Sequence, residues 1–132
     1  MTLDMEVEDL GIYNVENVKI INSEFNDVKH EIINVYRGGT DESTFGPIVT
    51  LRDVSIKNSG KGKRNKTNAA LRFHGVQKLL VDELNIEESK GIDLFMTNGE
   101  PITKLSNITF RGSDGLKTND EPYESKNIFY KK

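Results

Sequence analysis

The chain has 132 residues, a formal net charge of −3 and a hydrophobic fraction of 35%. This length suffices for one hydrophobic core, and the acidic balance provides no overall positive field for nucleic acid or an anionic membrane. Cysteine is absent, which excludes disulfides and thiolate metal sites. No apolar run approaches the roughly 20 residues that cross a bilayer, and the acidic start lacks the apolar centre of a signal peptide.

Five segments share one arrangement of residues, in which apolar residues occupy alternate positions on both sides of a polar position. In chain order they are residues 17–25, 49–56, 79–86, 103–110 and 123–130. Alternation with a period of two is typical of a β-strand with one buried face. Aligned on their last apolar residue, the segments are spaced by 31, 30, 24 and 20 residues. The position five residues earlier then forms a column: Ile20, Leu51, Val81, Leu105 and Ser125.

Two polar columns accompany the apolar ones. The first lies three positions before the end of each segment, and the second lies two positions after it. Asn and Asp tolerate left-handed backbone and bond to their own turn, so each segment is predicted to be two short strands joined at a bend. The bend positions are Asn22, Asp53, Glu83, Asn107 and Asn127, and the later positions are Asp27, Asn58, Glu88 and Gly112.

A further apolar strand is expected after three of the segments, at residues 32–36, 70–73 and 92–95. Three short strands per repeat describe the coils of a right-handed parallel β-helix, a pectate lyase-like solenoid in which equivalent residues stack. An antiparallel β-sandwich also has short strands, but it does not require the same columns in successive strands. We therefore predict an all-β chain of about four to five coils, with residues 1–132 forming a single domain.

Two insertions interrupt the repeat, and loops of a solenoid often carry its binding function. The second insertion runs from Gly60 to Asn68 and is rich in basic residues. It either attracts a polyanion or is a solvated loop. Its basic residues are Lys61, Lys63, Arg64 and Lys66.

The first insertion runs from Gly38 to Pro47 and is predicted to be an ordered structural clasp. Its two glycines allow a tight reversal, its proline fixes one dihedral angle where the chain re-enters a strand, and its phenylalanine requires a packing site. Its two acids can pair with Arg37. The residues assigned to this structural loop are Gly38, Gly39, Asp41, Glu42, Phe45 and Pro47.

The same region carries a resemblance to a known family. The run Tyr36-Arg37-Gly38-Gly39-Thr40-Asp41-Glu42-Ser43-Thr44-Phe45-Gly46-Pro47 resembles a segment of the polysaccharide lyases that include alginate lyases and chondroitinase B. The similarity is strongest to the C-terminal β-helical region of the alginate lyase branch. It spans nearly the whole chain, although this run is its one specific motif.

The resemblance implies a parallel β-helix and, for the intact enzyme, β-elimination at the C4–O bond of a uronate. In that family Ca²⁺ neutralises the substrate carboxylate, while a Lys acts as base and an Arg assists. In alginate-degrading members these groups lie in an N-terminal β-helical domain. No catalytic residue, metal ligand or cofactor is therefore assigned within this chain, and Ca²⁺ is expected in the catalytic domain of the parent enzyme.

The chain begins in a coil and ends in half a coil, which suggests the C-terminal part of a longer two-domain enzyme. Expected partners are the N-terminal catalytic β-helix domain, alginate or a related uronate polymer, and a second copy of the chain in a homo-oligomer. Nucleic acid and membrane are not expected. The resemblance also implies that the parent enzyme is secreted or periplasmic. The alternative function is a stand-alone carbohydrate-binding or adhesion β-solenoid, and a lyase activity of this chain itself is the weakest hypothesis.

Three residues are candidates for substrate binding. Arg37 ends a strand and either holds a uronate carboxylate through two parallel hydrogen bonds or pairs with Asp41 or Glu42 to fix the loop. Arg72 and His74 alternate with apolar residues of the strand at 70–73, so they leave it on one face. That face either contacts sugar or forms an outward polar ladder.

Overall fold

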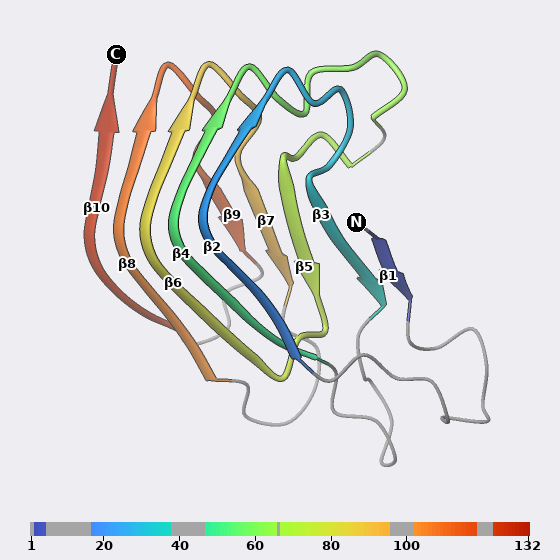
Figure 1. Ribbon diagram of the computed structural model, residues 1–132, viewed down its shortest axis with the longest axis vertical. Helices are drawn as coiled ribbons and strands as arrows, with labels where there is room; N and C mark the ends of the chain where they lie inside the picture. The colour runs from blue at the N-terminus through green and yellow to red at the C-terminus, as the bar shows by residue number, and fades with distance from the viewer. Residues whose placement is uncertain (1, 5–16, 38–46, 66, 96–101, 119–122) are drawn as a thin grey trace.

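A computed structural model of the protein describes residues 2–4, 17–37, 47–65, 67–95, 102–118 and 123–132. The described residues form ten β-strands and no helix, so they include no helix that could span a membrane. The strands make two parallel five-stranded sheets that face each other (Figure 1). This arrangement confirms the predicted parallel β-helix.

The first sheet, the long-strand sheet, contains one strand from each repeated segment (Figure 1). Its strands are β2 (Asn17–Asn26), β4 (Ile48–Lys57), β6 (Lys78–Glu87), β8 (Ile102–Arg111) and β10 (Glu124–Lys131). Their register is unshifted from one strand to the next, with Leu51 paired to both Ile20 and Val81, and Val81 also paired to Leu105. The predicted columns are therefore confirmed as stacked ladders.

The second sheet, the short-strand sheet, carries the return path of each coil. Its strands are β1 (Thr2–Asp4), β3 (Ile33–Arg37), β5 (Leu71–His74), β7 (Ile92–Phe95) and β9 (Leu116–Thr118). The three strands expected here are confirmed to within one residue at each end. Strands β1 and β9 were not predicted, because three-residue strands are too short to show alternation.

Left-handed residues set the bends of the coils. Asn22, Asp53, Glu83, Asn107 and Asn127 have φ angles of 52° to 59° in the middle of the long strands. The two predicted short strands are thus halves of one hydrogen-bonded strand that bends at this position. The second polar column, which includes Asn58 and Gly112, also has positive φ and turns the chain out of the long-strand sheet.

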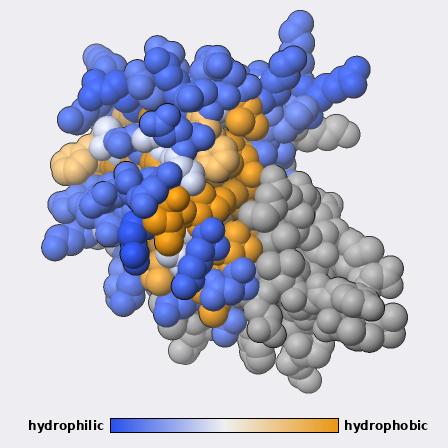
Figure 2. All heavy atoms as spheres, viewed as in Figure 1, coloured by the Kyte–Doolittle hydropathy of each residue, from blue (hydrophilic) through white to orange (hydrophobic). Residues whose placement is uncertain are grey.

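The hydrophobic core lies between the two sheets as one continuous cluster. Alternate residues of both sheets point into it, including Leu51 and Ile86 from long strands and Phe73 from β5, each no more than 1% exposed. On the face shown in Figure 2, apolar side chains gather in the middle, with hydrophilic side chains to the left of and above them. Burial of stacked apolar columns is the main stabilising contribution to such a fold.

A ladder of serines stabilises the turn that follows each long strand. Ser59 and Ser89 are buried, and each hydroxyl accepts a backbone N–H from the preceding coil: Val28 N to Ser59 Oγ at 3.2 Å and Ser59 N to Ser89 Oγ at 2.8 Å. Ser113 continues the ladder by accepting from Ser89 N at 2.9 Å. This ladder was not predicted from the sequence, although one more aligned column, three residues after the segments, contains these serines.

Candidate functional site

The candidate site lies on the outer face of the short-strand sheet. In β5, Leu71 and Phe73 are buried in the core, so the alternating residues Arg72 and His74 point outward, as predicted. The parallel register places Arg72 beside Asp93 of β7 and His74 beside Phe95. Side chains from two adjacent coils therefore meet on this face.

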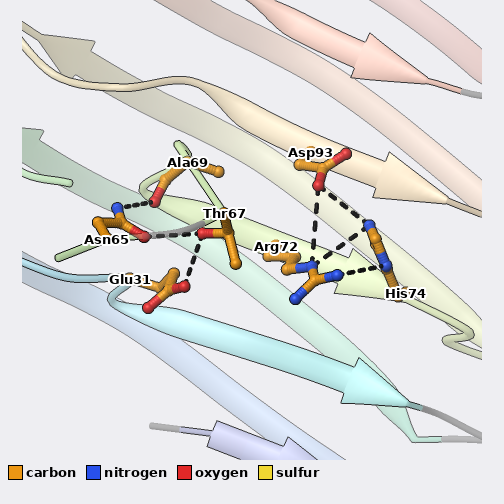
Figure 3. A network of polar contacts seen from close by, with 7 residues as sticks. All are labelled: Glu31, Asn65, Thr67, Ala69, Arg72, His74 and Asp93. Atoms are coloured by element: carbon orange, nitrogen blue, oxygen red, sulfur yellow. Dashed lines mark hydrogen bonds and ion pairs between the residues drawn. The ribbon is translucent and has the colours of Figure 1, made fainter. Parts of the chain in front are cut away.

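Arg72, His74 and Asp93 form one polar cluster, shown in Figure 3. Arg72 Nη2 lies 3.0 Å from His74 Nδ1, His74 Nε2 lies 3.0 Å from Asp93 Oδ2, and Arg72 Nε lies 3.8 Å from the same carboxylate oxygen. The three side chains are 17%, 22% and 26% exposed. They are thus mostly covered but accessible from one side.

These contacts select one tautomer of the histidine. A guanidinium has only donors, so Nδ1 of His74 accepts from Arg72, while Nε2 carries the proton and donates to Asp93. The 3.4 Å approach of Arg72 Nε to His74 Nε2 is therefore a close contact between two N–H groups rather than a hydrogen bond. A neutral imidazole satisfies both neighbours at once.

The electrostatics agree with this assignment. Burial lowers the pKa of His74 below its usual value of 6.5, the charge of Arg72 lowers it further, and the charge and hydrogen bond of Asp93 oppose both effects. The imidazole is therefore neutral at pH 7. Its basic nitrogen is engaged by Arg72, so it cannot accept a substrate proton unless that contact breaks.

An aromatic ring borders the cluster. Phe95 is 40% exposed, and its ring centroid lies 5.4 Å from that of His74 at an interplanar angle of 47°. The outer face thus places an apolar ring next to a guanidinium and a carboxylate. These groups can contact the apolar face, the carboxylate and the hydroxyls of a sugar acid, respectively.

A second network holds the insertion that precedes β5 (Figure 3). Asn65 Nδ2 donates to the carbonyls of Gly60 at 2.7 Å and Ala69 at 3.0 Å. The Thr67 hydroxyl lies 2.6 Å from Glu31 Oε1 and 2.9 Å from Asn65 Oδ1, and it donates its single proton to one of them. These bonds fix the start of β5 and thereby the strand that carries the candidate site.

The remaining sequence-based assignments have different outcomes. Pro47 is buried directly before β4, and its carbonyl accepts from Gln77 N at 3.0 Å. Arg37 ends β3 as expected, but its side chain lies outside the described part of the structure. The loop assignments at Gly38, Gly39, Asp41, Glu42 and Phe45 also lie outside the described residues and stay predictions.

Two further results concern an unpredicted site residue and possible metal ligands. Asp93 was not identified as a site residue, and it is the register between β5 and β7 that places it beside Arg72. Among the residues that the structure describes, no group of three or more His, Asp or Glu side chains could hold a metal ion.

Comparison with known proteins gives no match to a protein-family model and none to a curated protein. Solved structures do match. The PL6 family alginate lyase AlyGC is 38% identical to this chain, with a TM-score of 0.85 over 98% of the chain. The chain is similar to a segment of this alginate lyase. A mutant of the same enzyme matches at 38% identity and a TM-score of 0.81 over 96% of the chain.

The similarity is limited to part of the relative, because the chain spans 19% of the length of AlyGC. The matched segment nevertheless covers 98% of this chain. The resemblance to alginate lyases that residues 36–47 predicted is thereby confirmed, together with the β-helical fold.

Proposed function

We propose that this chain is a non-catalytic β-helix part of an alginate lyase-like enzyme. In this proposal its short-strand sheet contributes to binding the uronate polymer, and the coils support the catalytic β-helix domain of the same enzyme. The observation that carries the proposal is the 38% identity to an alginate lyase over 98% of the chain. The intact enzyme would act outside the cytoplasm, where its polymeric substrate is found.

The candidate site favours binding over catalysis. Elimination from a uronate requires a base that removes the proton next to the carboxylate. In the cluster described above, the basic nitrogen of His74 is occupied by Arg72, and its N–H is occupied by Asp93. The cluster is thus a fixed arrangement of charges, which suits recognition of a charged sugar.

Arg72 is the residue expected to recognise the uronate carboxylate. A guanidinium binds carboxylates through two parallel hydrogen bonds, a geometry that lysine cannot reproduce. The contacts to His74 and Asp93 hold its side chain in place, which reduces the entropy lost on binding. Phe95, on the adjacent coil, would pack against the sugar ring.

A first experiment tests the absence of catalysis. Elimination produces an unsaturated sugar that absorbs in the ultraviolet. We expect no rise in absorbance when the purified chain is incubated with alginate and Ca²⁺. A rise that is abolished by substituting a single Lys or Arg would show that the chain contains a catalytic centre and would overturn the proposal.

A second experiment tests the binding role. Titration calorimetry with a uronate oligosaccharide should show at least tenfold weaker binding for Arg72→Gln, equivalent to a loss of about 1.4 kcal/mol. Arg52→Gln is the matched control, because Arg52 is exposed on the long-strand sheet. Equal affinities for both variants would remove Arg72 from the sugar site.

The alternative, a stand-alone carbohydrate-binding or adhesion solenoid, gives the same result in both experiments. The complete gene separates the two. An upstream β-helical region that contains a catalytic Lys and Arg favours the lyase, and an open reading frame without one favours the stand-alone module.

A further inference from the structure

A second polar feature lies away from the candidate site, at the turns between long and short strands. The segment 27–30, which follows β2, and the segment 58–64, which follows β4, line an open surface pocket of about 670 Å³. We name it the turn pocket. Its polar lining consists mainly of Asp27, Lys29, His30, Lys61, Lys63 and Arg64. Its volume lies within the range of small-molecule sites in proteins.

The turn pocket is basic in an acidic protein. Four cationic side chains, Lys29, Lys61, Lys63 and Arg64, line it against the single carboxylate of Asp27, whereas the whole chain has a net charge of −3. Lys29, Lys63 and Arg64 form no ion pair with any described residue. Like charges around one cavity repel each other, and a bound anion would remove this repulsion.

The carboxylate in the pocket is already hydrogen-bonded. Asp27 Oδ1 accepts from Asn58 Nδ2 at 2.7 Å, and Asn58 Oδ1 accepts from Lys61 Nζ at 3.0 Å. The nearby acid Glu31 lies against Thr67 and does not line the cavity. These contacts orient Lys61 without a direct ion pair, so the positive charge of the pocket is only partly compensated.

The backbone of the pocket is held by the fold. Gly60 N donates to Val28 O and Gly62 N donates to Lys29 O, both at 2.8 Å. Gly62 is required at this approach, because a Cβ atom there would lie 2.7 Å from Lys29 O. The amide of Asn65 secures the far end of the loop, as described above. The basic insertion is therefore held against the preceding coil by hydrogen bonds.

We propose that the turn pocket is an anion-binding subsite that takes a carboxylated sugar of the polymer. The choice of a uronate over other anions rests on the proposed function, whereas the anion site itself rests on the charges and the cavity. The two segments that line the pocket precede β3 and β5 in the chain, and Arg72 lies on β5.

The experiment uses the full chain and three probes: a uronate trisaccharide, the same trisaccharide with its carboxylates reduced to alcohols, and inorganic phosphate. The test variant is Lys63→Gln/Arg64→Gln. The control variant is Lys19→Gln/Lys126→Gln, which removes the same charge from exposed positions on the long-strand sheet. Titration calorimetry at low and high salt measures each affinity, and thermal melting verifies that both variants are folded.

We expect the test variant to bind the uronate trisaccharide at least tenfold more weakly, and the control to change its affinity less than twofold. The reduced trisaccharide should bind at least tenfold more weakly than the uronate.

Equal losses in both variants would indicate non-specific attraction and overturn the site. Phosphate binding as tight as the uronate, and lost in the same variant, would retain an anion site but overturn its assignment to the sugar. Loss of uronate binding only in Arg72→Gln would leave the proposed function intact and overturn the turn pocket.

Discussion

The two sheets of this β-helix differ in how regularly their strands stack from one coil to the next. In the long-strand sheet, adjacent strands are offset by 31, 30, 24 and 20 residues, the same values that the apolar columns give, and each register holds along the whole strand. In the short-strand sheet, Ile33 of β3 pairs with Leu71 of β5, an offset of 38 residues, because both insertions lie between these strands. The register between β1 and β3 shifts between Leu3 and Asp4.

This difference separates the regular part of the molecule from the part that carries the candidate site. The long strands carry ladders of identical or similar residues, which maximise regular packing. The short strands are flanked by the insertions, and their outer face carries the cluster of Arg72, His74 and Asp93. The candidate binding residues thus lie on the less regular sheet, where the pairing of β5 with β7 brings them together.

The largest expected effect tests whether the two sheets share one core. Phe73 of the short-strand sheet is fully buried and belongs to the same cluster as Leu84 of the long-strand sheet. Phe73→Ala should lower the free energy of unfolding by about 3–5 kcal/mol and Leu84→Ala by about 2–5 kcal/mol. Denaturant titrations followed by circular dichroism measure both. A loss below about 1 kcal/mol for Phe73→Ala would show that the short-strand sheet contributes little to a shared core.

The serine ladder is expected to give the next effect. Ser89→Ala removes the acceptor for the backbone N–H of the buried residue Ser59, and should cost about 1–3 kcal/mol. Ser55→Ala is the matched control, because Ser55 lies on the outer face of β4 and should change the free energy of unfolding by less than about 0.5 kcal/mol. Similar losses at both positions would mean that the ladder gives no special stability to the turn.

A smaller and opposite effect is expected at the bend of the long strands. Glu83 is an exposed residue with a φ of 59°, and such left-handed backbone costs a non-glycine residue about 1–2 kcal/mol. Glu83→Gly should raise the free energy of unfolding by about 0.5–1 kcal/mol. Glu24→Gly, at an exposed position of β2 with ordinary strand backbone, should lower it by a similar amount. Destabilisation by both substitutions would show that the bend carries no strain.

The smallest effect concerns pH and the outer face of the short-strand sheet. Because the pKa of His74 is lowered in the folded state, the folded protein binds a proton there less readily than the unfolded chain. The stability that His74 contributes is therefore present above pH 6.5 and is lost as the pH falls below it. Denaturation at several pH values between about 7.5 and 5 should show a steeper loss for the native chain than for His74→Gln. Parallel curves would mean that the imidazole is not constrained by burial and Arg72.

The regular sheet was predicted well from the sequence because its signals are local and repeated. Each column, such as that of Ile20 and Leu51, appears in every coil, so the alignment of one segment supports the next. The bend residues were equally clear, since a polar residue within an alternating apolar pattern indicates a change of backbone direction. Asn22 and Asp53 illustrate this, and both have positive φ.

The candidate site was predicted only in part because it depends on register between strands of different length. The outward direction of Arg72 and His74 follows from alternation within β5 alone. The contact to Asp93 depends on how β7 stacks on β5, which the variable loops do not reveal. The turn pocket depends similarly on the approach of Gly62 to Lys29, two segments that are separated by an entire long strand.

The unshifted register of the long strands also has a consequence for how such a chain can evolve. Every long strand presents its neighbour with the same spacing of backbone donors and acceptors and the same apolar columns. Duplication of the gene segment for one coil would therefore insert a unit that is compatible with both neighbours from the start. The inserted copy could then diverge in its loops and acquire new ligands, while the columns that hold it in the stack stay under selection.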